Sequence, residues 1–165
     1  MSTLHERLWL WGQSPDVHWE HNNTYNLPGH SRMTAVEGLM YLDIPNICRV
    51  RMMGHPMPPY DQESIAMRPA KQVVWSLLGA GGEPVTEWGD TEEVVRQAKM
   101  FPNITGGVFV DFFIPKRIEH YTPAKLREIK EKLSAEAGRH LDMWVVCYED
   151  KLDSVPDIAS YLQPF

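Results

Sequence analysis

The sequence predicts an α/β protein, built as a partial (β/α) barrel of the TIM type with about five βα units and parallel strands. Two observations support this fold class. Five short apolar segments alternate with segments of helical periodicity, and the last three apolar segments are hydrophobic nearly throughout, as in parallel strands covered on both faces. The chain has 165 residues, of which 43% are hydrophobic. That length predicts a single (β/α) domain over residues 1–165.

The expected strands are rich in Val, Ile, Trp and Phe and are bounded by Gly, Pro, Asn or Asp. They lie at residues 8–11, 47–52, 73–78, 107–113 and 143–148. Capping residues mark the helices between them. The expected start signals are Ser31, Asp90 and the pair Thr122-Pro123, and shorter helices are expected after Tyr60 and over residues 155–162.

Strict alternation of strands and helices favours a parallel sheet with right-handed crossovers. Two architectures fit five such units. One is a complete five-stranded doubly wound sheet of the flavodoxin type, which the count of strands favours. The other is an incomplete barrel holding five of its eight units. The loops that follow the strands favour the barrel.

Charge and composition exclude several classes of protein. The formal net charge is −6, with 22 acidic and 16 basic residues, so no nucleic-acid partner is expected. No apolar run reaches the roughly 18 residues of a membrane span, and no signal peptide is visible at the start. Cys48 and Cys147 lie in separate apolar runs and are typical of reduced, buried thiols. The sequence therefore predicts a cytoplasmic protein without a membrane partner.

Functional side chains are expected at the carboxyl ends of the parallel strands. A long, polar and aromatic-rich connection follows the first strand, His55 follows the second, and Trp88 lies in the loop after the third. Long loops of this kind in small domains tend to be functional. The predicted substrate-binding residues are His18, Trp19, Glu20, His21, His55 and Trp88.

Two carboxylates follow neighbouring strands and are the predicted catalytic residues. Asp111 lies in an apolar run, where a carboxylate is costly to bury unless it is paired or used. Glu149 closes the fifth strand. A pair of carboxylates with separated pKa values supports acid/base or nucleophilic chemistry on glycosidic bonds. Aromatic side chains nearby would suit a carbohydrate.

A metal-dependent hydrolase is a further alternative, with His18, Glu20, His21 and His55 as ligands beside Asp111. However, His18 and His21 lack the i, i+4 helical spacing of zinc proteases. No glycine-rich phosphate cradle is present either. The sequence therefore predicts neither a resident metal nor a cofactor.

The segment Phe101-Pro-Asn-Ile-Thr-Gly leads into the fourth strand, which ends in Asp111 before Phe112-Phe113. With Tyr121-Thr-Pro-Ala-Lys-Leu and Leu141-Asp-Met-Trp-Val-Val-Cys-Tyr, it resembles a bacterial group of largely uncharacterised TIM-barrel proteins similar to glycoside hydrolases. The resemblance covers most of the chain. In that group two acidic residues often precede Phe-Phe, whereas here Val110 stands at the first position.

The resemblance implies a barrel that continues past strand five, with the acid at strand four and the nucleophile at a strand seven that this sequence does not reach. The predicted function is thus binding of a carbohydrate, with hydrolysis by a glycosidase activity left open. The alternative is a non-catalytic assembly module or a remnant half-barrel. Open edges at the first and fifth strands further predict a homodimer, or pairing with a missing C-terminal half of the barrel.

Overall fold

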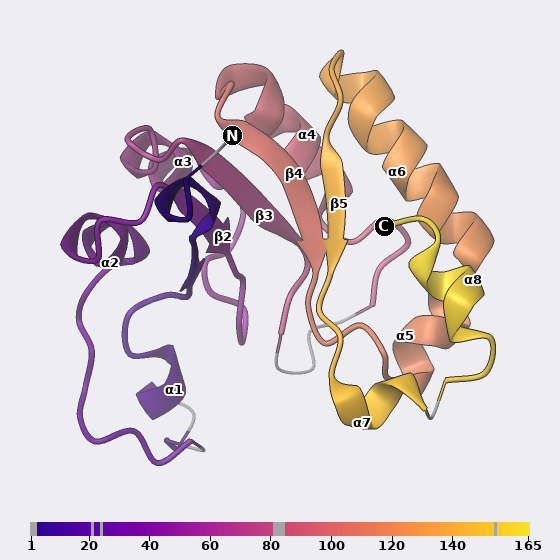
Figure 1. Ribbon diagram of the computed structural model, residues 1–165, viewed down its shortest axis with the longest axis horizontal. Helices are drawn as coiled ribbons and strands as arrows, with labels where there is room; N and C mark the ends of the chain where they lie inside the picture. The colour runs from indigo at the N-terminus through magenta and orange to yellow at the C-terminus, as the bar shows by residue number, and fades with distance from the viewer. Residues whose placement is uncertain (1–2, 21, 24, 81–84, 154) are drawn as a thin grey trace.

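The computed structural model describes residues 3–20, 22–23, 25–80, 85–153 and 155–165, and its centre is one five-stranded sheet (Figure 1). All pairings are parallel, and the spatial order of the strands is β1-β2-β3-β4-β5. This confirms the prediction of an α/β fold with a parallel sheet. The strands are β1 (Trp9–Gly12), β2 (Asn46–Arg49), β3 (Gln72–Leu78), β4 (Ile104–Phe109) and β5 (Asp142–Val145).

Helices connect the strands, and further short helices lie among the loops (Figure 1). They are η1 (His5–Arg7), α1 (Val17–Glu20), α2 (Ala35–Tyr41), α3 (Asp61–Ala66), α4 (Thr91–Met100), α5 (Pro115–His120), α6 (Pro123–Ala137), α7 (Glu149–Leu152) and α8 (Ile158–Leu162). No helix in the described part of the chain is both long and apolar enough to cross a bilayer.

The caps explain where the helices begin. Helix α6 begins as predicted, because the Thr122 hydroxyl accepts a hydrogen bond from the Lys125 N–H and Pro123 occupies the first turn. Helix α2 begins later than the Ser31 signal predicted. Thr34 and Glu37 form a reciprocal capping box there, which satisfies two backbone N–H groups at once.

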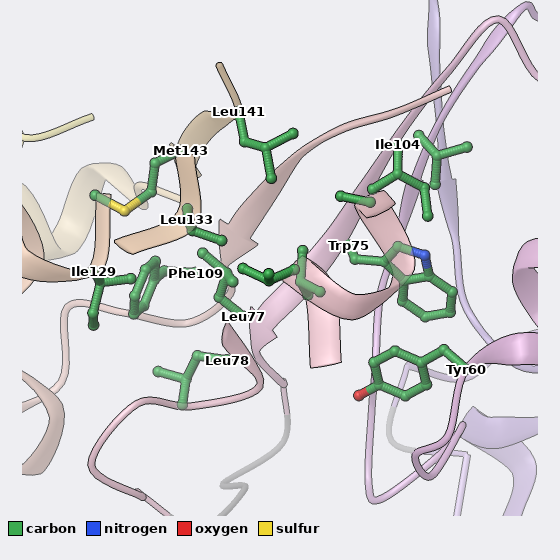
Figure 2. Packing of buried hydrophobic residues seen from close by; sticks show 14 of the residues in the cluster. Tyr60, Trp75, Leu77, Leu78, Ile104, Phe109, Ile129, Leu133, Leu141 and Met143 are labelled. Atoms are coloured by element: carbon green, nitrogen blue, oxygen red, sulfur yellow. The ribbon is translucent and has the colours of Figure 1, made fainter. Parts of the chain in front are cut away.

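The larger hydrophobic core lies between the sheet and the helices. Helix α2 contacts β1 and β2, and helix α4 contacts β3, β4 and α6. Figure 2 shows Tyr60 beside Trp75 in this core, with ring centroids 4.3 Å apart and nearly parallel planes. Both rings are fully buried. This stacked pair joins the chain before α3 to the middle of the sheet.

A second, smaller core covers the opposite face of the sheet. Because side chains alternate across a strand, Cys48, Val74 and Val108 face away from the large core and pack together there. Trp9 from β1 and Trp144 from β5 join this cluster, with ring centroids only 4.5 Å apart in an edge-to-face contact. These two strands form the opposite edges of the sheet, so the sheet curls until side chains from its edges meet. This face is therefore concave.

Two adjacent glycines in β4 allow the neighbouring strands to pack closely. A methyl group on Gly106 would lie 2.4 Å from the carbonyl oxygen of Asp142, and one on Gly107 would lie 2.4 Å from Cγ of Leu77. Both distances are well below van der Waals contact. Leu77 is fully buried in the large core, where side chains are closely packed, so a shift of its side chain would disturb its neighbours. Any larger residue would push β4 away from its partners.

We predict that Gly107→Ala lowers the free energy of unfolding by about 1–3 kcal/mol, because the added methyl group overpacks the core against Leu77. Urea denaturation followed by tryptophan fluorescence measures the change. Gly29→Ala is the matched control, since a methyl group on Gly29 meets no atom within 4 Å. Its expected effect is within about 0.5 kcal/mol. Equal stability of Gly107→Ala and the parent protein would show that the contact is relaxed in solution.

The edges of the sheet predict self-association. Among the described strands, β1 pairs only with β2 and β5 only with β4, which leaves one side of each strand without a ladder. Leu8, directly before β1, and Trp11, within β1, are 42% and 45% exposed. Met40, Tyr41 and Leu42 at the end of α2 are exposed as well. Unpaired strand edges beside apolar side chains favour association. We expect static light scattering at several protein concentrations to report a dimer, and a monomer at every concentration would contradict this prediction.

Candidate functional site

A pocket of about 510 Å³ opens at the carboxyl ends of the strands, above the concave face of the sheet. Each of the five strands, or the residues directly after it, contributes to the wall. We call this cavity the strand-end pocket. It is lined by Trp11, Gln13, His18, Tyr25, Met52, Met53, Ala80, Val110, Asp111, Val146 and Tyr148.

Asp111 lies two residues after β4 and has a backbone φ of +47°, in the left-handed region that non-glycine residues rarely adopt. The guanidinium of Arg117, from α5, fixes the turn around it. Arg117 is 1% exposed and donates to the main-chain carbonyls of Asp111 at 3.0 Å, Gly79 at 2.8 Å and Val110. These contacts tie the ends of β3 and β4 together. Arg117 is thus a positioning residue for Asp111.

Tyr148 is the hydrogen-bonding neighbour of Asp111 in the pocket. Its hydroxyl donates to Oδ1 of Asp111 at 2.8 Å. Partial burial, followed by the hydrogen bond to Asp111 and the negative charge there, raises the pKa of Tyr148 to about 12. Near neutral pH the phenol therefore keeps its proton and acts as a donor. Asp111 and the protonated Tyr148 hydroxyl therefore lie side by side in the pocket wall.

The long connection after β1 contributes His18 and Tyr25 to the wall, with ring centroids 4.7 Å apart in an edge-to-face contact. Trp19 holds this connection in place. Its Nε1 donates to the carbonyl of Gly29 at 2.6 Å, and its ring stacks on His30 at 4.2 Å. Trp19 therefore anchors the loop and lines a neighbouring hollow under it, while His18 faces the strand-end pocket.

The other predicted site residues lie apart from this pocket. Glu149 is exposed in the first turn of α7 and does not line the pocket, so its pairing with Asp111 stays a prediction. Glu20 is exposed at the end of α1. His55 is exposed and exchanges two backbone hydrogen bonds of 2.9 Å with Met52 in a tight turn. His21 lies outside the described residues.

Trp88 packs against the large core on the helix side of the sheet, away from the concave face. Nζ of Lys125 lies 3.1 Å from the centroid of its ring, and Nζ of Lys132 lies 5.0 Å away. These two lysines from α6 cover the indole. The predicted platform for a sugar is thus occupied by side chains of the protein.

Sequence reasoning missed Trp11, Gln13, Tyr25 and Tyr148 as pocket residues. For Tyr148 the signal was the alternation along the fifth apolar run. Residues 144, 146 and 148 share a parity, and Trp144 and Val146 both belong to the concave cluster. Glu149 lies beyond the strand, in the first turn of α7. Trp11 follows Trp9 by the same step of two.

Within the described residues, no group of three or more His, Cys, Asp and Glu side chains is arranged to hold a metal ion. His18, Glu20 and His55 therefore do not form the ligand set considered from the sequence. Both cysteines are free thiols, and burial raises the pKa of Cys48 to about 12. A thiol with such a pKa is a poor nucleophile near neutral pH. Neither cysteine lines the strand-end pocket, where Asp111 is the carboxylate among the described residues.

Comparisons with protein-family models, with curated proteins and with solved structures found no match to this chain.

The raised pKa of Tyr148 predicts an alkaline transition. We expect an absorbance titration of the parent protein, compared with Tyr148→Phe, to assign Tyr148 a pKa of about 12. Since the ordinary tyrosine pKa is about 10, this group stabilises the fold below about pH 10, and that stability is lost as the pH rises towards about 12. Asp111→Asn removes the neighbouring charge and should lower the pKa.

Asp150→Asn is the control for this titration, because Asp150 is an exposed carboxylate in α7 that pairs with Lys151 at 2.6 Å. It carries the same change of charge without a hydrogen bond to Tyr148. A smaller shift is expected than with Asp111→Asn. Equal shifts in the two variants would mean that the contact between Tyr148 and Asp111 does not hold the proton.

Proposed function

We propose that this chain forms a section of a (β/α) barrel and binds a carbohydrate in the strand-end pocket. The strand order supports the barrel-type architecture, because β1 to β5 follow one another without a reversal. A flavodoxin-like sheet has the order 2-1-3-4-5 and covers both faces with helices. The contact between Trp9 and Trp144 also supports a barrel, since barrel interiors are filled by inward-pointing side chains.

The observation that carries the functional proposal is Asp111, hydrogen-bonded to Tyr148 within an aromatic-lined cavity at the carboxyl ends of parallel strands. Ligand pockets combine apolar walls with a few polar groups that fix orientation. Here the rings of Trp11, Tyr25 and Tyr148 offer faces for the C–H groups of a sugar. The carboxylate, with the nearby amide of Gln13, offers partners for its hydroxyl groups.

Binding is the function that this arrangement supports best. Hydrolysis of a glycosidic bond in most retaining and inverting enzymes uses two carboxyl groups, one on each side of the bond. Asp111 is the single carboxylate among the described residues that line the pocket. It is our candidate for the general acid/base, and Tyr148 would orient it. The resemblance to glycoside hydrolases at the end of β4 agrees with this role.

A non-catalytic assembly module is the second candidate function. The exposed side chains beside β1 and at the end of α2 favour it, because they form an apolar surface next to an open strand edge. Of these residues, Trp11 also lines the strand-end pocket with Asp111, whereas Met40 and Tyr41 do not. Substitutions at Met40 or Tyr41 therefore test association without changing a residue of the strand-end pocket.

We predict that Asp111→Asn weakens binding of an oligosaccharide at least about tenfold and abolishes any glycosidase turnover, because the amide retains the shape but loses the charge. A panel of neutral and charged oligosaccharides, measured by isothermal titration calorimetry and with chromogenic glycosides, tests this. The melting temperature should stay close to that of the parent protein.

Asp150→Asn controls for the loss of one negative charge on the same side of the molecule, and we expect it to behave as the parent protein does. Equal binding and turnover in Asp111→Asn and the parent protein would contradict the role of Asp111. A large drop in melting temperature would instead assign Asp111 to the stability of the turn that Arg117 holds.

A further inference from the structure

A smaller cavity lies next to the strand-end pocket, under the long connection that follows β1. It has a volume of about 280 Å³ and is walled by β1, by this connection and by α2, so we call it the α2 hollow. Trp11, Gln13 and His18 line both cavities. Because the two cavities share these side chains, a ligand in the strand-end pocket that extends past Trp11 enters the α2 hollow.

The wall of the α2 hollow is mostly aliphatic. Leu27, Met33 and Leu42 line it with exposed fractions of 38%, 45% and 53%, and Leu10 and Pro15 belong to the same apolar lining. None of these five side chains lines the strand-end pocket. Water against such a wall is released when an apolar group replaces it, which makes the burial of that group favourable.

Among the described residues, the polar side chains that line only the α2 hollow are largely engaged within the protein. The Thr34 hydroxyl takes part in the capping box of α2. Oγ of Ser14 accepts a hydrogen bond of 3.1 Å from the guanidinium of Arg49, and Oδ2 of Asp16 lies 3.4 Å from Nδ1 of His30. A sugar in this hollow would give up the water around its hydroxyl groups for few new partners, which disfavours it. An apolar group has no such cost.

We infer that the ligand is a glycoside with an apolar alkyl or aryl aglycone, whose sugar lies in the strand-end pocket and whose aglycone lies in the α2 hollow. This inference rests on the proposed function. The continuity of the two cavities at Trp11, Gln13 and His18 supports one ligand that spans both. The indole of Trp11 contacts the ligand where its sugar and its aglycone meet.

Isothermal titration calorimetry tests the inference with pairs of methyl and hexyl β-glycosides of glucose, galactose and xylose. Two further probes are cellobiose, which places a second sugar where the alkyl chain would lie, and 1-hexanol, which has no sugar. Each methylene group moved from water to an apolar wall strengthens binding by about two- to fourfold. We therefore expect at least one hexyl glycoside to bind about tenfold or more tightly than its methyl partner, and cellobiose to bind no better than methyl glucoside.

Two variants locate the effect. Met33→Gln keeps an unbranched side chain and makes it polar. Gly38→Ala adds a methyl group 3.4 Å from Cδ2 of Leu10 and 3.7 Å from Sδ of Met33, so it takes up room in the hollow at ordinary contact distances. Both variants should weaken binding of the hexyl glycoside severalfold and leave that of the methyl glycoside unchanged.

Met100→Gln is the matched control, because Met100 is also 45% exposed but lies in α4 and lines neither cavity. Circular dichroism shows whether each variant is folded. If Met33→Gln fails to fold, Gly38→Ala still tests the site, since alanine is favoured over glycine within a helix. Equal effects of Met33→Gln and Met100→Gln would overturn the placement of the aglycone in the α2 hollow.

The outcomes separate this inference from the proposed function. Equal binding of methyl and hexyl glycosides, or tighter binding of cellobiose than of hexyl glucoside, overturns the apolar aglycone and leaves a carbohydrate site. Binding of 1-hexanol as tightly as of the hexyl glycosides overturns the carbohydrate and the glycoside together. Failure of all the probes to bind overturns both as well.

A second copy of the chain is the competing occupant of the α2 hollow, because Leu42 also belongs to the apolar surface beside β1. The titrations are therefore repeated at a tenfold lower protein concentration, with light scattering on the same samples. Binding of the hexyl glycoside that weakens as the protein associates would assign the hollow to the partner copy and overturn the inference. Binding that is independent of protein concentration supports it.

Discussion

The close packing of β3, β4 and β5 around two glycines is the constraint on which the rest of the structure depends. Gly106 and Gly107 leave room for the carbonyl of Asp142 on one side and for Leu77 on the other. Strand β4 is thereby held tightly between its two neighbours in a curled sheet. The curl brings Trp9 and Trp144 into contact and forms the concave face. The pocket lies at the end of that face because all five strands point the same way.

The buried guanidinium of Arg117 fixes the main chain at the ends of β3 and β4, where the pocket lies. Burying a guanidinium is costly unless its donors are satisfied, and here carbonyls from the ends of β3 and β4 accept them. The same contacts hold Asp111 in a left-handed backbone conformation. Strained residues persist where the surroundings over-determine them, and they cluster at functional sites. Tyr148 then approaches the carboxylate from the residues between β5 and α7, while Arg117 holds the main chain of Asp111 from α5.

The sequence predicted the five strands and their parallel direction, because each short apolar run between turn residues forms a strand. The fourth strand was predicted to extend over residues 107–113, but β4 ends at Phe109. Phe112 and Phe113 lie beyond its end and are buried. An apolar run does not distinguish a strand from a buried turn. Asp111 was found because a carboxylate in such a run is exceptional. The pattern of a carboxylate after each strand pointed to Glu149 and gave no sign of Tyr148, which the structure places beside Asp111.

Trp88 shows why residue type alone misplaces a binding residue. Both Trp88 and Trp11 lie near the end of a strand, but they lie on opposite faces of the sheet. On the helix side, the ammonium group of Lys125 lies over the indole of Trp88 and makes a cation–π contact with it. Cations also approach Trp75 and Phe101 on that side. Among the contacts of the described residues, no cation lies over Trp11, Tyr25 or Tyr148, and these three rings line the strand-end pocket instead.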